Sequence, residues 1–172
     1  SRAGPLAAAD GDRIGVVSLT SYRTAADADE IVAAGRGLDV MARLVAVPGS
    51  APEVASGELE AWIESRRAPL QAERDELAEI LPTVDEGSEF IPVYQADIDR
   101  LDTMLGQLSV DGELVFALVV RGPADALRAL TAQAEVRLVD VGLDDEFRGG
   151  ASYTGLRPEE LDLAGSPDQR PL

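Results

Sequence analysis

The sequence predicts an α+β protein built on one antiparallel sheet. Residues 14–47 and residues 114–141 each have the order strand, helix, strand, and we interpret them as two copies of one βαβ unit. Between the copies, in residues 48–113, apolar residues recur at helical spacing. A 45% apolar content in 172 residues is enough for a hydrophobic core. The two copies therefore predict a sheet, and the segment between them predicts a helical insertion.

Composition sets the boundaries of the predicted domain. Residues 1–12 are small and polar, and contain Pro and Gly, as expected for a linker or a trimmed N-terminus. A single α+β domain is expected over residues 13–141, including the insertion 48–113. Residues 142–172 are rich in Gly, Pro and acidic residues, with few apolar anchors, so we expect an extended, peripheral C-terminal tail.

The first copy starts with an apolar strand at residues 14–19. Thr24 is a predicted helix N-cap with Asp27 at the third helical position, where an acid complements the free N–H groups. The helix is expected to end at a glycine, at position 35 or 37, because glycine readily adopts the left-handed cap conformation. Residues 40–47 then form the second strand.

The second copy repeats this order. Residues 114–120 form an apolar strand, Gly122 is the expected N-cap, and Pro123 fits the first helical position, where its missing N–H costs nothing. Asp125 then takes the third helical position, as Asp27 does in the first copy. Residues 136–141 form the last strand.

Two right-handed βαβ units in tandem assemble into a four-stranded antiparallel sheet of the ferredoxin-like kind, with strand order 4-1-3-2. This order places strands 14–19 and 114–120 in the centre, and both lack charged residues. The expected edge strands carry Arg43, and Arg137 with Asp140. Because charges on edge strands discourage pairing with other chains, the charge pattern favours this order.

The insertion is predicted to be an αα-hairpin between strands 2 and 3. Apolar residues at spacings of three, four and seven from Leu59 to Leu81 indicate one helix, or two helices kinked at Pro69. A second apolar stripe from Phe90 to Leu108 indicates its partner.

One sheet face is left without a cover by this fold. Strand 114–120 is apolar on both faces, whereas the two helices of the βαβ units cover one face only. The hairpin, the tail or a second subunit is expected to cover the other.

The charge balance limits the classes of partner. Fifteen basic against 32 acidic residues give a formal net charge of −17, which argues against nucleic acid and anionic membranes. It favours a basic protein partner, cations, or a charge that serves solubility alone. No stretch of about 18 apolar residues occurs, so the visible chain is not expected to insert into a membrane.

The chain also lacks His, Cys, Lys and Asn, and every basic residue is Arg. The loss of Lys and Asn is typical of GC-rich coding, as in an actinobacterial-type composition. Without His, Cys and Lys there is no imidazole base, thiolate or Schiff base, and the usual zinc ligands are missing. We therefore predict no catalytic residue, metal centre or cofactor, although chemistry based on carboxylates stays an alternative.

Three groups of residues are candidates for binding. On the hairpin, Arg66 lies four residues after Trp62, so its guanidinium can stack on the indole. Together with Tyr94 on the second stripe, this pair is a candidate partner-binding surface; core packing is the other interpretation.

The second candidate is an anion or ligand site at two strand-to-helix turns. Arg121 and Gly122 precede the free N–H groups of a helix, although Pro123 removes one donor. Arg23 marks a similar, hydroxyl-rich turn in the first copy.

The third candidate is the acidic run in residues 140–146, namely Asp140, Asp144, Asp145 and Glu146. Its oxygens could bind Ca²⁺ or Mg²⁺, but the spacing is not that of an EF-hand loop, and a solvated loop is the simpler interpretation.

These observations favour a non-enzymatic protein-interaction or sensory module whose inserted helices contact a partner. We expect the soluble, extracytoplasmic part of a membrane-tethered protein rather than a cytoplasmic one, because a signal or anchor could precede residue 1; an ordinary fragment boundary would look the same. One alternative is a small-molecule-binding regulatory domain that acts as a homodimer. The other is a carboxylate-based cation site or enzyme.

Overall fold

The computed structural model describes residues 11–47, 51–142, 148 and 153–163. Its strands are β1 (Asp12–Arg23), β2 (Asp39–Val45), β3 (Glu53–Ser56), β4 (Val115–Pro123) and β5 (Val136–Val141). Its helices are α1 (Ala25–Ala33), α2 (Leu59–Ile80), α3 (Phe90–Gln107) and α4 (Ala124–Ala129), with a 3-10 helix at Pro158–Leu163 near the end. The described part is thus a mixed α+β structure.

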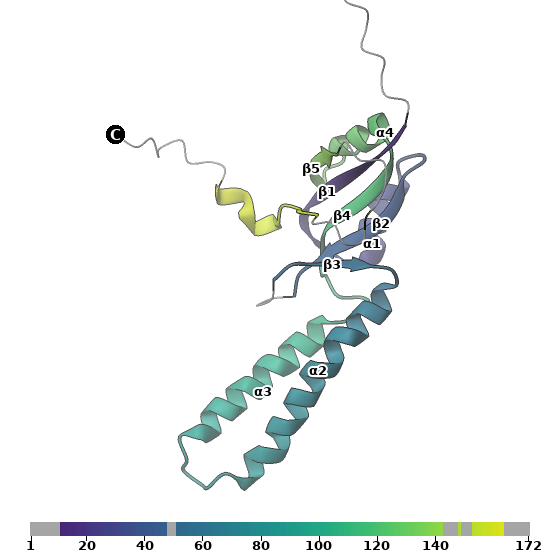
Figure 1. Cartoon of the computed structure of the whole chain (residues 1–172). Coiled ribbons are helices and arrows are strands. Elements are labelled where there is room, and N and C mark those ends of the chain that lie inside the picture. The colour runs from purple at the N-terminus through teal and green to yellow at the C-terminus, as the bar shows by residue number, and fades with distance from the viewer. Residues whose placement is uncertain (1–10, 48–50, 143–147, 149–152, 164–172) are drawn as a thin grey trace, which may run out of the picture.

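All five described strands belong to one antiparallel sheet (Figure 1). Their order is β3-β2-β4-β1-β5, and every neighbouring pair runs antiparallel. Helices α2 and α3 form a hairpin that projects away from the sheet, as Figure 1 shows. None of the helices in the described part is long and apolar enough to cross a membrane.

The sheet has five strands rather than the predicted four, because the segment expected to be helical begins with β3. Since β3 pairs with β2, strand β2 is not an edge strand. Arg43 of β2 therefore does not protect an edge: its Nε donates to Oδ1 of Asp29 in α1 at 3.1 Å. Strand β3 has only four residues, too few for an alternating pattern to be recognised in the sequence.

The two βαβ units begin their helices differently. Thr24 caps α1 as predicted, with its hydroxyl oxygen accepting a hydrogen bond of 3.1 Å from the N–H of Asp27. In the second unit Gly122 lies in β4, Pro123 is the N-cap, and Asp125 is the second helical residue. The predicted alignment of the two caps is therefore wrong by one residue.

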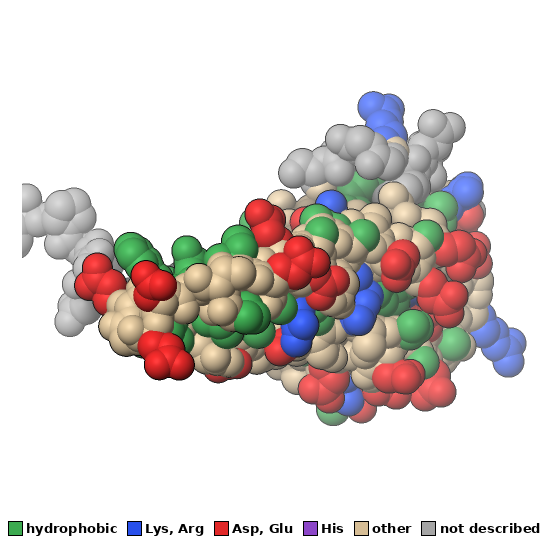
Figure 2. All heavy atoms as spheres, turned by 90° about the horizontal axis from the view of Figure 1, so that it is seen from below, with side chains coloured by type: hydrophobic (Ala, Val, Ile, Leu, Met, Phe, Trp, Pro, Cys, Tyr) green, Lys and Arg blue, Asp and Glu red, His purple; other side chains and the backbone are tan. Residues whose placement is uncertain are grey.

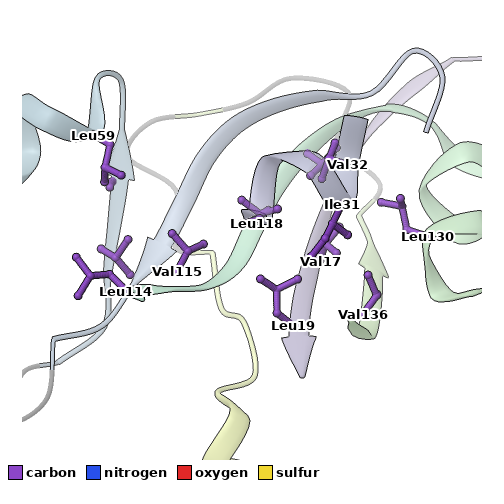
Figure 3. Close-up of a cluster of buried hydrophobic side chains, with 14 of the residues drawn as sticks. Val17, Leu19, Ile31, Val32, Leu59, Leu114, Val115, Leu118, Leu130 and Val136 are labelled. Carbon is purple, nitrogen blue, oxygen red and sulfur yellow. The ribbon is translucent and has the colours of Figure 1, made fainter. Parts of the chain in front are cut away.

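The main core lies between the sheet and helices α1 and α4, and reaches the start of α2 (Figure 3). Val17 and Leu19 from β1 and Leu118 from β4 are fully buried there. Burial of each such side chain contributes about 1.5–3 kcal/mol to folding. The other core residues labelled in Figure 3 are Ile31, Val32, Leu59, Leu114, Val115, Leu130 and Val136.

Residues 153–160, which we call the strap, run over the opposite sheet face. Tyr153 packs against a second buried cluster that includes Phe116 and Val119. A Cβ on Gly155 would lie 2.5 Å from the Cβ of Ala117, so the strap backbone runs directly on the sheet. The hairpin, the tail and a second subunit were the expected covers of this face, and residues 153–160 of the tail pack on it.

Candidate functional site

The base of the hairpin joins helix α2 to the edge of the sheet. The Arg66 guanidinium carbon lies 5.8 Å from the centroid of the Trp62 ring, which confirms the predicted stacking. The Nε of Arg66 also donates to Oε2 of Glu53 at 2.9 Å. Because Glu53 belongs to β3, this ion pair ties the hairpin to the strand that the sequence did not reveal.

A pocket of about 180 Å³ opens beside this ion pair. Its walls come from β2, β3, α2, α3 and residues next to them, and are mostly apolar, with Trp62, Leu70, Met104 and Leu108 among them. The Arg66–Glu53 pair is its charged element. The arrangement suits a small apolar or aromatic group better than a free anion, because the charge of Arg66 is already balanced by Glu53.

Arg67 has a role that the sequence did not reveal. Its Nη1 donates to the carbonyl oxygens of Leu105 and Leu108, at 2.6 and 2.7 Å. Leu105 lies in the last turn of α3 and Leu108 is its C-cap, where no further helical N–H can reach the carbonyls. The cation also complements the negative end of the helix dipole, so Arg67 fixes the end of α3 against α2.

Ion pairs across the hairpin define which helix faces meet. Arg74 Nε lies 2.9 Å from Oδ1 of Asp102, and Arg100 Nη2 lies 3.9 Å from Oε1 of Glu73. Seven residues make two helical turns and return to nearly the same face. Ile80 lies two turns beyond Glu73 toward the hairpin tip, and Val93 lies two turns from Arg100 in the same direction. Because Glu73 and Arg100 face each other, Ile80 and Val93 lie on helix faces that also meet.

Apolar side chains are exposed where these helix faces reach the tip. Phe90 is 55% exposed, Val93 53% and Ile80 37%. The Phe90 ring stacks on Tyr94, with ring centroids 6.4 Å apart and an interplanar angle of 28°. We call Ile80, Phe90, Val93 and Tyr94 the tip patch.

The three predicted partner-binding residues do not form one surface. Trp62 and Arg66 lie at the base of the hairpin, whereas Tyr94 stacks on Phe90 near the tip. Ile80 follows Trp62 by 18 residues on the same helix, which corresponds to roughly 27 Å at the α-helical rise.

The two predicted anion sites lie at opposite ends of the β1–β4 pair, since Arg121 is opposite Ile14 and Arg23 is opposite Val115. Arg121 forms an ion pair of 3.6 Å with Asp12. Gly122 is required for packing, because a Cβ there would stand 2.5 Å from the carbonyl oxygen of Gly37. The Nε of Arg23 is buried and has no hydrogen-bond partner in the described part of the chain.

Of the predicted acidic run, residues 144–146 lie outside the described residues, and Asp140 is exposed on β5. Among the residues that the structure describes, no group of three acids is arranged to hold a metal ion.

The strap is joined to the sheet by polar contacts as well as by packing. The backbone N–H of Leu156 donates to the hydroxyl of Ser18 at 3.0 Å, and the Tyr22 hydroxyl donates to Glu159 at 2.9 Å. Burial, followed by this hydrogen bond and the nearby carboxylate charge, raises the pKa of Tyr22 to about 12. A hydrogen bond from its own backbone N–H, followed by those from Tyr22 and Arg157, holds the pKa of Glu159 below its ordinary value.

Comparisons with protein-family models, curated proteins and solved structures find no match for this chain. A function proposed for it therefore depends on the geometry and the charges of its own residues.

Proposed function

We propose that this chain is a non-enzymatic protein-interaction or sensory module that binds a protein partner through the distal end of its hairpin. The exposure of the tip patch carries this proposal: Phe90 and Val93 are each more than half exposed, next to Ile80 and Tyr94. Leaving apolar area in water forgoes about 25 cal/mol per Å². Contiguous exposed apolar side chains are therefore typical of surfaces that bind other proteins.

The other predicted residues have a supporting role in this proposal. Trp62 and Arg66 hold the base of α2 against β3, through the ring stack and the ion pair with Glu53. Tyr94 is the predicted residue that belongs to the binding surface itself. A projecting hairpin held firmly at its base presents its tip in a defined direction, which lowers the entropy lost on binding.

A crosslinking experiment tests the proposal at two matched positions. A photoreactive amino acid replaces Val93 in one variant and Val110 in the other; these valines are 53% and 47% exposed. In cells of the source organism we expect one discrete crosslinked product from position 93 and none from position 110, because Val110 precedes β4 and lies outside the tip patch. Equal products at both positions, or none at position 93, would contradict the proposal.

For the scaffold, we infer a ferredoxin-like sheet extended by one edge strand. Without β3, the strand order is β5-β1-β4-β2, which corresponds to the predicted order 4-1-3-2 and supports this inference. Strands β1 and β2 both pair antiparallel with β4, so they run parallel to each other, as this fold requires. The two strand–helix–strand units also support an internal repeat, although their helix caps are displaced by one residue.

A small-molecule-binding regulatory domain is the second candidate, and the pocket beside Trp62 favours it. Its location at the hairpin base differs from the strand-to-helix turns that the sequence suggested. Trp62 is the single tryptophan of the chain, so its fluorescence reports on occupancy of the pocket. Apolar and aromatic fragments at millimolar concentration are expected to shift its emission; no change across such a panel would exclude this candidate.

A further inference from the structure

The charges around the tip patch indicate which kind of protein partner it can bind. Residues 75–99, the distal half of the hairpin, contain eight acidic residues and no Lys or Arg. The four arginines of the hairpin all lie outside this range, nearer its base, at positions 66, 67, 74 and 100. In the view of Figure 2, the projecting hairpin accordingly carries hydrophobic and acidic side chains, and basic ones lie only toward the sheet.

Most of these acids are available to a partner. Asp75 lies 3.7 Å from Arg74, and Asp97 lies 3.8 Å from Arg100. The other six make no ion pair within the described part of the chain, and they are Glu76, Glu79, Asp85, Glu86, Glu89 and Asp99. Glu79 and Glu89 directly adjoin Ile80 and Phe90 in the sequence. The apolar side chains of the tip patch are thus bordered by negative charge that the chain itself leaves unbalanced.

This combination excludes several occupants of the tip patch. A second tip would bring two unbalanced sets of acids together, and like charges at close range repel each other. Anionic lipid headgroups and nucleic acid phosphates are disfavoured for the same reason. A partner with apolar and basic side chains satisfies both parts of the surface, because apolar area is buried at the centre while opposite charges meet at the rim.

We propose that the tip patch binds a basic amphipathic protein segment, in which aliphatic or aromatic side chains lie next to Arg or Lys. This inference rests on the proposed function and adds the chemistry of the partner to it. The apolar side chains contribute most of the affinity, since desolvated aromatic and aliphatic anchors dominate interfaces. The acids set the preference for a positive partner and make the binding depend on salt.

A selection from a displayed library of random helical peptides tests the inference on the full chain. The double variant Phe90→Ser, Val93→Ser serves for counter-selection, so that only binders of the tip patch remain. We expect the selected peptides to carry a net positive charge and a stripe of apolar residues. Their affinity should fall about a hundredfold on the double variant and about tenfold when the acids are neutralised in Glu79→Gln, Glu86→Gln, Glu89→Gln.

Matched controls separate a local effect from damage to the fold. Val110→Ser removes an exposed valine elsewhere, and Glu30→Gln with Glu113→Gln removes exposed acids elsewhere. Peptide affinity should be the same on these controls as on the unchanged chain, and all variants should show the same thermal unfolding midpoint. Because every substituted side chain at the tip is exposed or half-buried, the tip variants are expected to fold.

The outcomes distinguish this inference from the proposed function. Tip-dependent peptides with no excess of Arg and Lys, or with affinity insensitive to salt, would overturn the inference and leave the interaction role standing. Failure to enrich any peptide that depends on Phe90 and Val93 would count against both. Basic apolar peptides that weaken on both tip variants would support the inference.

Discussion

The Tyr22 hydroxyl links two distant segments of the chain, because it joins β1 to the strap. It donates to Glu159, which is 137 residues further along the chain. The acceptor is a carboxylate, and the donor is partly removed from water, so the neutral phenol is favoured over the phenolate. The titration of Tyr22 therefore reports on whether the strap is in place.

We predict that Tyr22 ionises near pH 12, about two pH units later than an ordinary tyrosine. The pKa of Tyr22 is higher in the folded chain than in the unfolded chain, so the neutral phenol stabilises the fold. This contribution is fully present below pH 10 and is lost as the pH rises toward 12. The ultraviolet absorbance of the phenolate should include a late step near pH 12. Tyr22→Phe should remove that step.

Glu159→Gln should move the late step to lower pH, because the negative charge disappears while the burial of Tyr22 persists. Tyr94→Phe is the control and should leave the step unchanged, since Tyr94 lies at the hairpin tip. A late step that stays at the same pH in Glu159→Gln would show that the contact with Glu159 does not contribute to it.

At the scale of elements, α2 supplies the cation that binds the free carbonyls at the end of α3. The sequence at this end contains no basic residue, so the helix has no local partner for its final carbonyls. Arg67 provides it across the hairpin, with two hydrogen bonds from one nitrogen. The two helices therefore stabilise each other through more than their apolar stripes.

Replacing Arg67 tests this link between the helices. Arg67→Met keeps the length of the side chain but leaves the carbonyls of Leu105 and Leu108 without their partner, and should lower the free energy of unfolding by about 1–3 kcal/mol. Arg100→Met is the matched control, with a loss of about 0–1 kcal/mol, because its ion pairs of 3.8 and 3.9 Å are exposed. Urea unfolding measures both; equal losses would contradict the proposed role of Arg67.

For the whole molecule, the sheet is covered on both faces by segments of different kinds. Helices α1 and α4 lie over the main core, and the strap lies over Phe116 and its neighbours. The strap is short and contributes few buried side chains, so its attachment is expected to be the weaker of the two. The hairpin takes no part in covering the second face, which leaves its tip available for binding.

Deletion of residues 153–172 should therefore expose an apolar sheet face. We expect the truncated chain to bind a hydrophobic dye and to lose about 1–3 kcal/mol of its free energy of unfolding. We also expect it to self-associate, as measured by light scattering. Deletion of residues 164–172 alone is the control, because it leaves every described contact of the strap intact. Dye binding and stability that are unchanged in the longer deletion would show that the strap does not protect the sheet.

Much of the secondary structure could be predicted because its signals are local. The apolar spacing of α2 and α3 and the Thr24 cap each depend on residues within a few turns of one another. The Trp62–Arg66 stack was predictable for the same reason, as the two residues are four apart on one helix. Strand β5 was also predicted with its observed ends.

Contacts between distant segments could not be predicted in this way. Strand β3 exists because its backbone groups pair with β2, and the strap lies on the sheet because Gly155 allows a close approach to Ala117. Arg67 meets the end of α3 only after the hairpin has closed. The spacing of residues along the chain determines which face of each helix or strand is apolar. Which of these faces pack against each other depends on the competition among all of them during folding, so only the tertiary structure reveals it.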